Sequence, residues 1–304
     1  MPRRPAPAGL PVRPAFREAL TPALSGPMPW AQRLAAGVRG YALALLAVTV
    51  AGGVAGAQTA APAPGPGGAT PGGVAEWLAQ GDRESLARRP AAALAAYEKA
   101  LAADSLSPAA HWRAARELVD LGEFDTDEAR RTGRYARALG HARRAVALHP
   151  GDAEGHFHLS RALGRTALAV GPRERVRYAT DVRAAALAAL AIAPRHAGAQ
   201  HVLGVWHAEV MRLNGVTRAV ARAFMGGAVF ATASWGEATR LLEAAVAAEP
   251  DRIVHRLDLA RIYRDSGQRA AARGAYQEAL RLALHDANDD RYRRSAEEEL
   301  RRLP

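Results

Sequence analysis

The stretch Ala145-Val-Ala-Leu-His-Pro150 decides the fold, because the chain repeats it. It returns as Ala189-Leu-Ala-Ile-Ala-Pro194 and as Ala245-Val-Ala-Ala-Glu-Pro250. Looser copies begin at Ala100 and Ala279. Each copy alternates small and aliphatic residues, as the last turns of a closely packed helix do, and the proline then ends that helix. A helix-ending phrase that recurs every few dozen residues predicts a stack of helical repeats.

Helical periodicity extends over most of the chain from about residue 74 to residue 303. Apolar residues recur at spacings of three and four, for example at Leu159, Leu163 and Ala167. The sequence has no run of strict alternation rich in β-branched residues, which would indicate a strand. It therefore predicts an all-α fold.

The composition excludes several kinds of site. The 304 residues include no cysteine, so disulfides, thiolate metal ligands and cysteine nucleophiles are excluded. The formal charge is +11, but the first 57 residues hold six arginines and one acidic residue, and so they carry +5 of it. The basicity that would suggest a nucleic-acid partner is thus nearly halved in the remainder. We expect no nucleic-acid binding.

The first 57 residues are organised like an export signal. We expect the true start to be Met28, after a segment rich in proline and arginine. Arg33 and Arg39 form a basic region, the apolar stretch 41–54 follows, and small residues precede a cleavage site after Ala57. This order predicts a Sec-type signal peptide and an exported protein, either periplasmic or secreted. The alternative is an uncleaved membrane anchor, although the apolar stretch is shorter than the roughly 20 residues of a span.

The remainder divides into a linker and one helical domain. Residues 58–73 are mostly alanine, proline and glycine, a composition with nothing to bury. We therefore predict an N-terminal extension with signal peptide at 1–57, a linker at 58–73 and a helical repeat domain at 74–304.

The clearest repeat unit lies near the C-terminus. A first helix over 253–266 carries Tyr263 on its inner side, Gly267 makes the turn, and a second helix places Tyr276 between small alanines. The unit at 74–108 has the same pattern. These units resemble the tetratricopeptide repeat (TPR) family, which implies a right-handed solenoid of antiparallel helix pairs with a concave binding surface. The residues that define the repeats are Trp77, Gly81, Ala93, Tyr97, Ala100, Trp112, Ala145, Pro150, Pro194, Gly204, Trp206, Trp235, Ala238, Pro250, Tyr263, Gly267, Ala272, Tyr276 and Ala279.

The middle units are longer than the 34 or so residues of a standard TPR. The second unit has extra residues around 123–133, and the fourth runs from His196 to Pro250. The excess of the fourth unit lies around 214–234 and includes Gly226-Gly227, which we expect to form a hinge or a tight helix crossing. Ser234, followed three residues later by Glu237, predicts a capping box at the start of a helix.

A second resemblance covers roughly the last half of the chain. Leu203-Gly-Val-Trp206-His-Ala-Glu209 is followed by a basic helix through Arg218 and Arg222, and then by Ala233-Ser-Trp235-Gly-Glu-Ala238 and Glu249-Pro250. This order resembles the regulator of microtubule dynamics family, in a divergent bacterial form. The microtubule association of its eukaryotic members is not carried over, because an exported bacterial protein meets no microtubules.

The TPR resemblance implies where a partner would bind. Outward positions on the first helix of each pair line a groove that holds a peptide or a partner's helix. On this chain these positions include Arg113, Glu117, Arg161, Arg165, His201, Arg261 and Arg264. Arginine bonds carboxylates in a bidentate manner, so an acidic segment or a free C-terminus would suit such a groove. The alternative is that the arginines are ordinary surface residues paired with neighbours such as Glu117 or Asp265.

The sequence favours a protein-interaction scaffold over an enzyme. It has no G-x-S-x-G motif, and Gly226-Gly227 lacks the strand and the Gly-Lys-Ser/Thr of a phosphate loop. We predict no catalytic residue and no cofactor.

The ten histidines raise a metal alternative. Their spacings do not match a known ligand pattern, so we expect them to pack beside tryptophan or to bond to backbone, and we predict no metal site. The alternative is a periplasmic metal- or small-ligand-binding protein. Its ligands would come from His111, His156, His158, His201 and His207.

Overall fold

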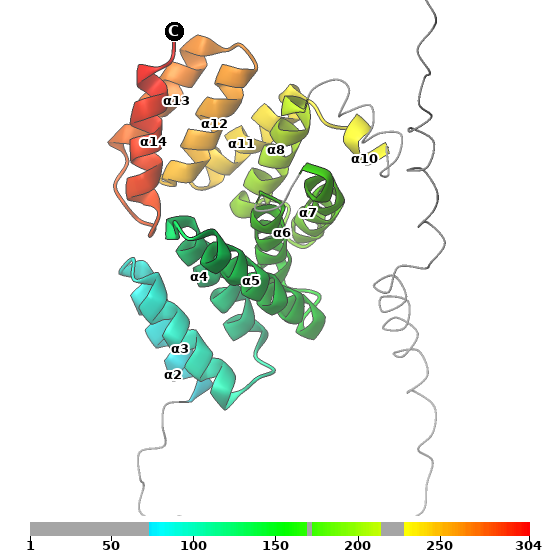
Figure 1. The fold of residues 1–304 in the computed structure, drawn as a ribbon, viewed down its shortest axis with the longest axis vertical. Coiled ribbons are helices and arrows are strands. Elements are labelled where there is room, and N and C mark those ends of the chain that lie inside the picture. The colour runs from blue at the N-terminus through cyan, green and yellow to red at the C-terminus, as the bar shows by residue number, and fades with distance from the viewer. Residues whose placement is uncertain (1–72, 169–171, 214–227) are drawn as a thin grey trace, which may run out of the picture. The chain divides into compact units, whose positions relative to one another are not determined.

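The computed structural model describes residues 73–168, 172–213 and 228–304, and within these ranges it contains twelve helices and no strand (Figure 1). The helices pack in sequential antiparallel pairs. The pairs are α2 (Val74–Leu86) with α3 (Pro90–Ala103), α4 (Pro108–Phe124) with α5 (Glu128–Leu148), α6 (Ala153–Leu168) with α7 (Pro172–Ile192), α8 (Ala197–Arg212) with α11 (Trp235–Ala248), and α12 (Ile253–Asp265) with α13 (Arg269–Arg281). The short α10 (Ala228–Ala231) precedes α11, and α14 (Asp289–Arg301) ends the chain. The predicted all-α repeat fold is confirmed.

The repeated phrase marks helix ends, as predicted. Helices α5, α7 and α11 end at Leu148, Ile192 and Ala248, each two residues before the proline of its phrase. The carbonyls of these prolines are also polar partners. The carbonyl of Pro150 pairs with His156 Nε2 at 2.8 Å, and those of Pro194 and Pro250 accept from side chains six residues further on, at 3.2 Å each. Each phrase therefore ends one helix and anchors the start of the next.

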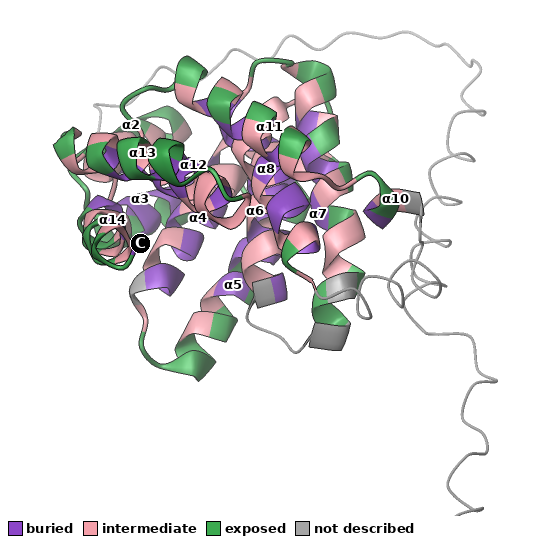
Figure 2. Cartoon of the chain, turned by 90° about the horizontal axis from the view of Figure 1, so that it is seen from above, coloured by how far each residue is buried: buried purple, intermediate pink, exposed green. Residues whose placement is uncertain are grey.

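Small residues let the paired helices approach closely, and tyrosines fill the space that remains. The core alanines of both the first and last pairs are buried, as are Tyr97 and Tyr276. Figure 2 shows how buried residues (purple) are distributed over the helices. Gly81 lies against the Tyr97 ring so closely that an added Cβ would overlap it. Gly267, between α12 and α13, has a φ of +85°, a conformation that glycine adopts without strain.

The extra length of the middle units has two different locations. In the second and third pairs it extends the second helix, because α5 and α7 each have 21 residues whereas α3 has 14. In the fourth pair it lies between α8 and α11, where Phe230 of α10 is buried and stacks on Trp206 with ring centroids 6.1 Å apart. Gly226-Gly227, Arg218 and Arg222 lie outside the described residues, as do the predicted leader and linker up to residue 72.

The predicted cap at Ser234 is half confirmed. Helix α11 begins at Trp235, and the Ser234 hydroxyl accepts a hydrogen bond from the Glu237 amide at 3.1 Å. Glu237 does not complete the capping box, because its carboxylate pairs with Arg240 at 2.8 Å. The Ser234 amide instead donates to His207 Nδ1 at 3.4 Å, which ties the end of the long insertion to α8.

The C-terminal helix returns to the second helix pair. In Figure 1, α14 lies on the same side of the helical domain as α2 and α3. The hydroxyl of Tyr292 donates to Glu123 of α4 at 2.6 Å, and Asn288 approaches the carbonyl of Asp120 at 3.5 Å. These contacts bring together residues almost 170 positions apart, and so the row of first helices curves around a partly enclosed space. None of the described helices is both long enough and apolar enough to cross a membrane.

Candidate functional site

The space inside this curve is a groove with a volume of about 530 Å³. We call it the central groove. Its walls come mainly from α4, α6, α7, α8 and α12, and its far side comes from residues 285–292 before and within α14. The apolar part of its lining includes Trp112, Phe157, Val202, Val205 and Trp206. First helices supply all five of these residues, because the stacking of the pairs turns the first helices inward.

Trp206 fixes the floor of the central groove. It is buried, and its indole Nε1 donates to the carbonyl of Ala179 in α7 at 2.7 Å. Phe230 covers the other side of the indole, so the long insertion supports the floor from behind.

His158 contributes a buried polar atom to the groove. Its ring stacks on Trp112 with centroids 5.1 Å apart and planes 5° apart, and only 4% of the residue is exposed. Its Nε2 lies 3.5 Å from the Glu154 carboxylate, but its Nδ1 has no hydrogen-bond partner among the described residues. Burial lowers the pKa of His158 to about 4, so the ring is neutral at pH 7.

Four of the seven predicted partner-binding residues line the central groove: Glu117, Arg161, Arg165 and His201. All four have partners within the chain. Arg161 is paired with Asp120, and Arg165 with Glu123. Buried Glu117 accepts from Arg116 at 2.8 Å and from the Ser85 hydroxyl at 2.9 Å. Burial alone would lower the pKa of Arg161, but the carboxylates of Asp120 and Glu123 raise it above its ordinary value.

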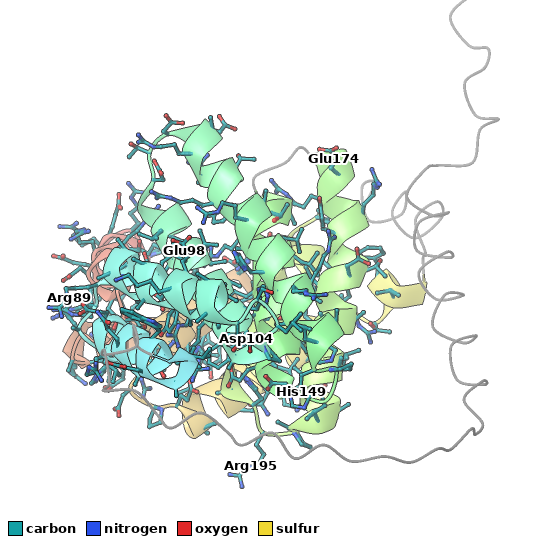
Figure 3. The ribbon with its side chains drawn as sticks, turned by 90° about the horizontal axis from the view of Figure 1, so that it is seen from below. Arg89, Glu98, Asp104, His149, Glu174 and Arg195 are labelled. Atoms are coloured by element: carbon teal, nitrogen blue, oxygen red, sulfur yellow. The ribbon has the colours of Figure 1, made fainter. Side chains whose placement is uncertain are left out.

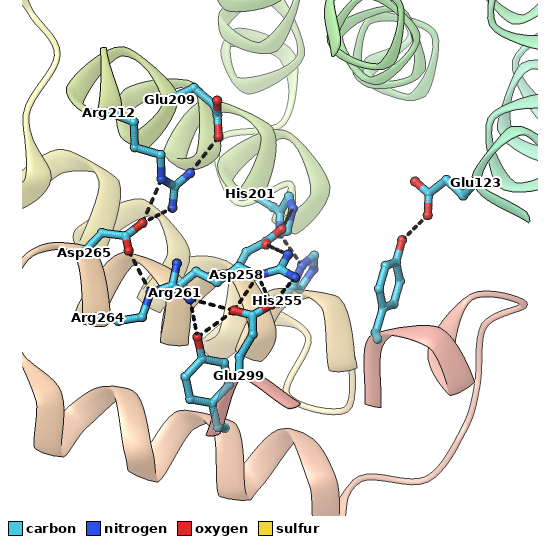
Figure 4. Close-up of polar contacts among 12 residues, drawn as sticks. Glu123, His201, Glu209, Arg212, His255, Asp258, Arg261, Arg264, Asp265 and Glu299 are labelled. Carbon is cyan, nitrogen blue, oxygen red and sulfur yellow. Dashed lines mark hydrogen bonds and ion pairs between the residues drawn. The ribbon is translucent and has the colours of Figure 1, made fainter. Parts of the chain in front are cut away.

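The other three predicted residues do not line the central groove. Arg113 pairs with Asp82 at 2.9 Å. Arg261 and Arg264 belong to the chain of polar contacts in Figure 4, in which both bind Glu299 of α14, at 2.6 and 2.8 Å. These arginines join neighbouring helices, which corresponds to the alternative that surface arginines pair with their neighbours.

His201 is part of the same contact network. Its Nε2 lies 3.2 Å from Asp258, and its Nδ1 lies 2.8 Å from Nδ1 of His255 (Figure 4). Burial lowers the pKa of His255 to about 4, and the neighbouring His201 adds to the shift. Burial would raise the pKa of Asp258, but its contacts with His201 and Arg261 hold it well below its usual range. The network therefore joins α8 to α12 and then to α14.

The charges on the groove wall are nearly balanced. The described lining contains five arginines and seven carboxylates, and the histidines lie among them. The carboxylates that sequence reasoning did not anticipate include Asp120, Glu154, Glu249 and Asp258. The sequence pattern does not reveal these carboxylates as groove residues, because each one pairs with a residue on another helix or at its start. The groove thus has no excess of arginine to attract an acidic segment.

Some of the histidines make the contacts that the sequence predicted. His158 stacks on tryptophan, and His111 and His156 pair with backbone carbonyls. His149, in contrast, is exposed at the end of α5, in the company of charged surface residues such as Asp104 and Arg195 (Figure 3). Within the described residues, no group of three or more histidine and carboxylate side chains has a geometry that could hold a metal ion.

Comparison with solved structures agrees with the helical repeat. A thermophilic TPR protein of Thermus thermophilus matches with a TM-score of 0.54 and 24% identity, over 73% of this chain and 98% of that one. At this identity the likeness shows the fold alone. Pseudomonas aeruginosa PilF matches with a TM-score of 0.41 and 15% identity, over 76% of this chain and 91% of that one, and no argument rests on it.

Sequence comparison identifies the family. No curated protein matches the chain significantly. The model of the family described as regulator of microtubule dynamics protein 1-3 matches residues 76–304, which is the whole helical domain except for its first residues. This match confirms the resemblance drawn from Trp206 and Trp235, and extends it to the N-terminal pairs. The chain therefore belongs to the regulator of microtubule dynamics protein 1-3 family and has a TPR-like fold.

Proposed function

We propose that this protein is a non-catalytic interaction scaffold that binds an extended segment of a partner protein in the central groove. The observation that carries the proposal is the groove itself, with its apolar floor of first-helix residues. A TPR-like fold supports it, since stacked helix pairs form extended concave surfaces suited to peptides.

The lining favours a particular kind of segment. Trp112, Phe157 and Val202 offer apolar surface to one or two apolar side chains of the partner. Because four of the five groove arginines are already paired with carboxylates and Arg175 donates to the carbonyl of Ala167, the part of the segment inside the groove is uncharged in this proposal.

Gly164 provides a direct test of the groove. It lies in α6 on the groove wall, and a Cβ added there would meet no atom within 4 Å. The substitution Gly164→Leu should therefore fill part of the groove without a clash. Gly140 in α5 is a matched control, because it is exposed, lies outside the groove and also has open space around a Cβ.

The measurement uses the purified full chain and peptides selected on it from a random library. We expect Gly164→Leu to weaken the selected peptides at least about tenfold, and Gly140→Leu to leave their affinity unchanged. Both variants should melt at or above the wild-type temperature, since replacing a helical glycine stabilises by about 0.5–1 kcal/mol. Equal binding by the two variants would contradict the proposal.

We further propose that the scaffold is exported. The support is the order of basic, apolar and small residues before Ala57. N-terminal sequencing of the protein from its native host should find Gln58 as the first residue. A mature protein that retains residues 41–54 would instead support the anchored alternative.

A further inference from the structure

A second cavity, of about 400 Å³, lies beside the central groove. We call it the arginine pocket. It is formed by the end of α4, the start of α5, and parts of α6, α12 and α14. Its lining residues are Glu123, Asp125, Arg131, Tyr135, Arg165, Arg261, Arg291, Tyr292 and Ser295. Arg165 and Tyr292 line both cavities, so the arginine pocket and the central groove share a wall.

The arginine pocket has an excess of positive charge. Four arginines line it against two carboxylates, and both carboxylates already have partners. Glu123 pairs with Arg165 and accepts from Tyr292, whereas Asp125 pairs with Arg130 and Arg134, which lie outside the pocket.

Two of the four pocket arginines lack a carboxylate partner among the described residues. Arg261 is bound by Glu299 and Asp258, but Arg131 and Arg291 have no ion pair within the described ranges. Among the described residues, the Arg131 guanidinium donates a 3.4 Å hydrogen bond to the backbone carbonyl of Asp125. These two guanidinium groups come from different helices, Arg131 from α5 and Arg291 from α14.

Hydroxyl groups complete the polar lining. Tyr135 is buried beside Gly122, and burial raises the pKa of its hydroxyl, which therefore stays protonated and able to donate. Ser295 lies one turn along α14 from Arg291. Guanidinium and hydroxyl donors directed at one space are the chemistry that recognises an oxyanion.

We propose that the arginine pocket binds a carboxylate of the same partner segment that occupies the central groove, with Arg131 and Arg291 as its main ligands. That the ligand is a peptide rests on the proposed function. The anionic groups of an unmodified peptide are carboxylates, so a carboxylate is the anion that the pocket would bind. The shared wall of Arg165 and Tyr292 places an acidic residue of the segment next to its apolar part. The partner segment is thus apolar in the groove and acidic at the pocket.

The test uses labelled peptides and fluorescence anisotropy on the full chain at low ionic strength. One probe is acetyl-hexaglutamate amide, which carries only side-chain carboxylates. A second is acetyl-hexaglutamine with a free C-terminus, and the uncharged reference is acetyl-hexaglutamine amide. Comparison of the first two probes tells whether the carboxylate comes from a side chain or from the end of a chain.

The critical variant is Arg131→Gln with Arg291→Gln. Its matched control is Arg143→Gln with Arg294→Gln, which removes two exposed arginines from the same two helices, α5 and α14, outside the pocket. We expect at least one carboxylate probe to bind the wild type more tightly than the reference. The pocket variant should weaken that probe about tenfold or more relative to the control variant.

Three results would overturn the proposal. The first is an equal loss of probe affinity in the two double variants, and the second is equal binding of the charged and uncharged probes. The third is displacement of hexaglutamate by inorganic phosphate at a phosphate concentration far below that of the carboxylate groups of the hexaglutamate. The last would reassign the pocket to phosphate. None of these probes needs the apolar floor, so a negative result with them would not affect the groove test with Gly164→Leu. A negative groove test would likewise leave the carboxylate probes as a valid test of the arginine pocket.

Discussion

At the scale of single residues, His158 is where burial and charge oppose each other most clearly. The ring stacks on Trp112 inside the groove wall, and Glu154 is its acidic neighbour. Glu154 favours the protonated ring, whereas Arg161 and Arg116 disfavour it, and burial has the largest effect. A buried polar group without a full set of partners costs stability.

This depressed pKa predicts acid sensitivity. The unfolded chain binds a proton at His158 below about pH 6.5, but the folded chain does so only near pH 4, so stability falls as the pH falls between these values. Between pH 7 and pH 5, the unfolding free energy of the wild type should fall by about 1–2 kcal/mol more than that of His158→Phe. The measurement is urea unfolding at both pH values. His255 shifts in the same direction and is present in both proteins, so an identical loss would show that His158 is not the source.

At the scale of elements, close approach of paired helices depends on a few glycines and alanines. Gly81 of α2 faces Tyr97 of α3, whose hydroxyl is held by Asp82 at 2.7 Å and by Arg116 at 2.9 Å. Because the ring is fixed at both its face and its hydroxyl, it cannot move aside for a methyl group. The pair must separate if Gly81 acquires a side chain.

The expected cost is measurable against a glycine without such a neighbour. Gly81→Ala should destabilise the chain by about 1–3 kcal/mol through overpacking. Gly274→Ala, in the exposed interior of α13 where nothing described lies near an added Cβ, should stabilise it by about 0.5–1 kcal/mol. Denaturant unfolding of both variants checks the sign. Destabilisation by both substitutions would mean that helix packing at Gly81 is not the cause.

The sequence predicted the elements better than it predicted their lengths. Proline and the small-residue phrase act within their own helix, so they marked the ends of α5, α7 and α11 correctly. Tyr97 and Tyr276 act within their own helix pair and were correctly predicted to fill the space between the paired helices. The extra residues of the second unit were expected around 123–133, and the structure places part of them in the first turns of α5, which begins at Glu128 and has 21 residues. An alanine- and arginine-rich helix can lengthen by a turn or more without changing its periodicity, so the pattern located the added residues but did not show that they extend a helix.

At the scale of the whole molecule, the pairing of charges was the part that sequence could not supply. The groove residues Glu117, Arg161, Arg165 and His201 were placed correctly on first helices, but their partners come largely from other helices. The return of α14 to α4 through Tyr292 and Glu123 links residues 169 positions apart. No local pattern encodes such a contact, and it is this contact that separates the central groove from the arginine pocket and places Arg131 near Arg291.

The most direct measurement of the central claim is hydrogen exchange of the full chain with and without a library-selected peptide. If the segment lies in the central groove, exchange should slow in α4, α6 and α8, which line it. It should stay unchanged in α3 and α13, which contribute to the lining of neither the central groove nor the arginine pocket. Protection confined to α3 and α13, with α4, α6 and α8 unaffected, would place the partner on the outer surface and contradict the account.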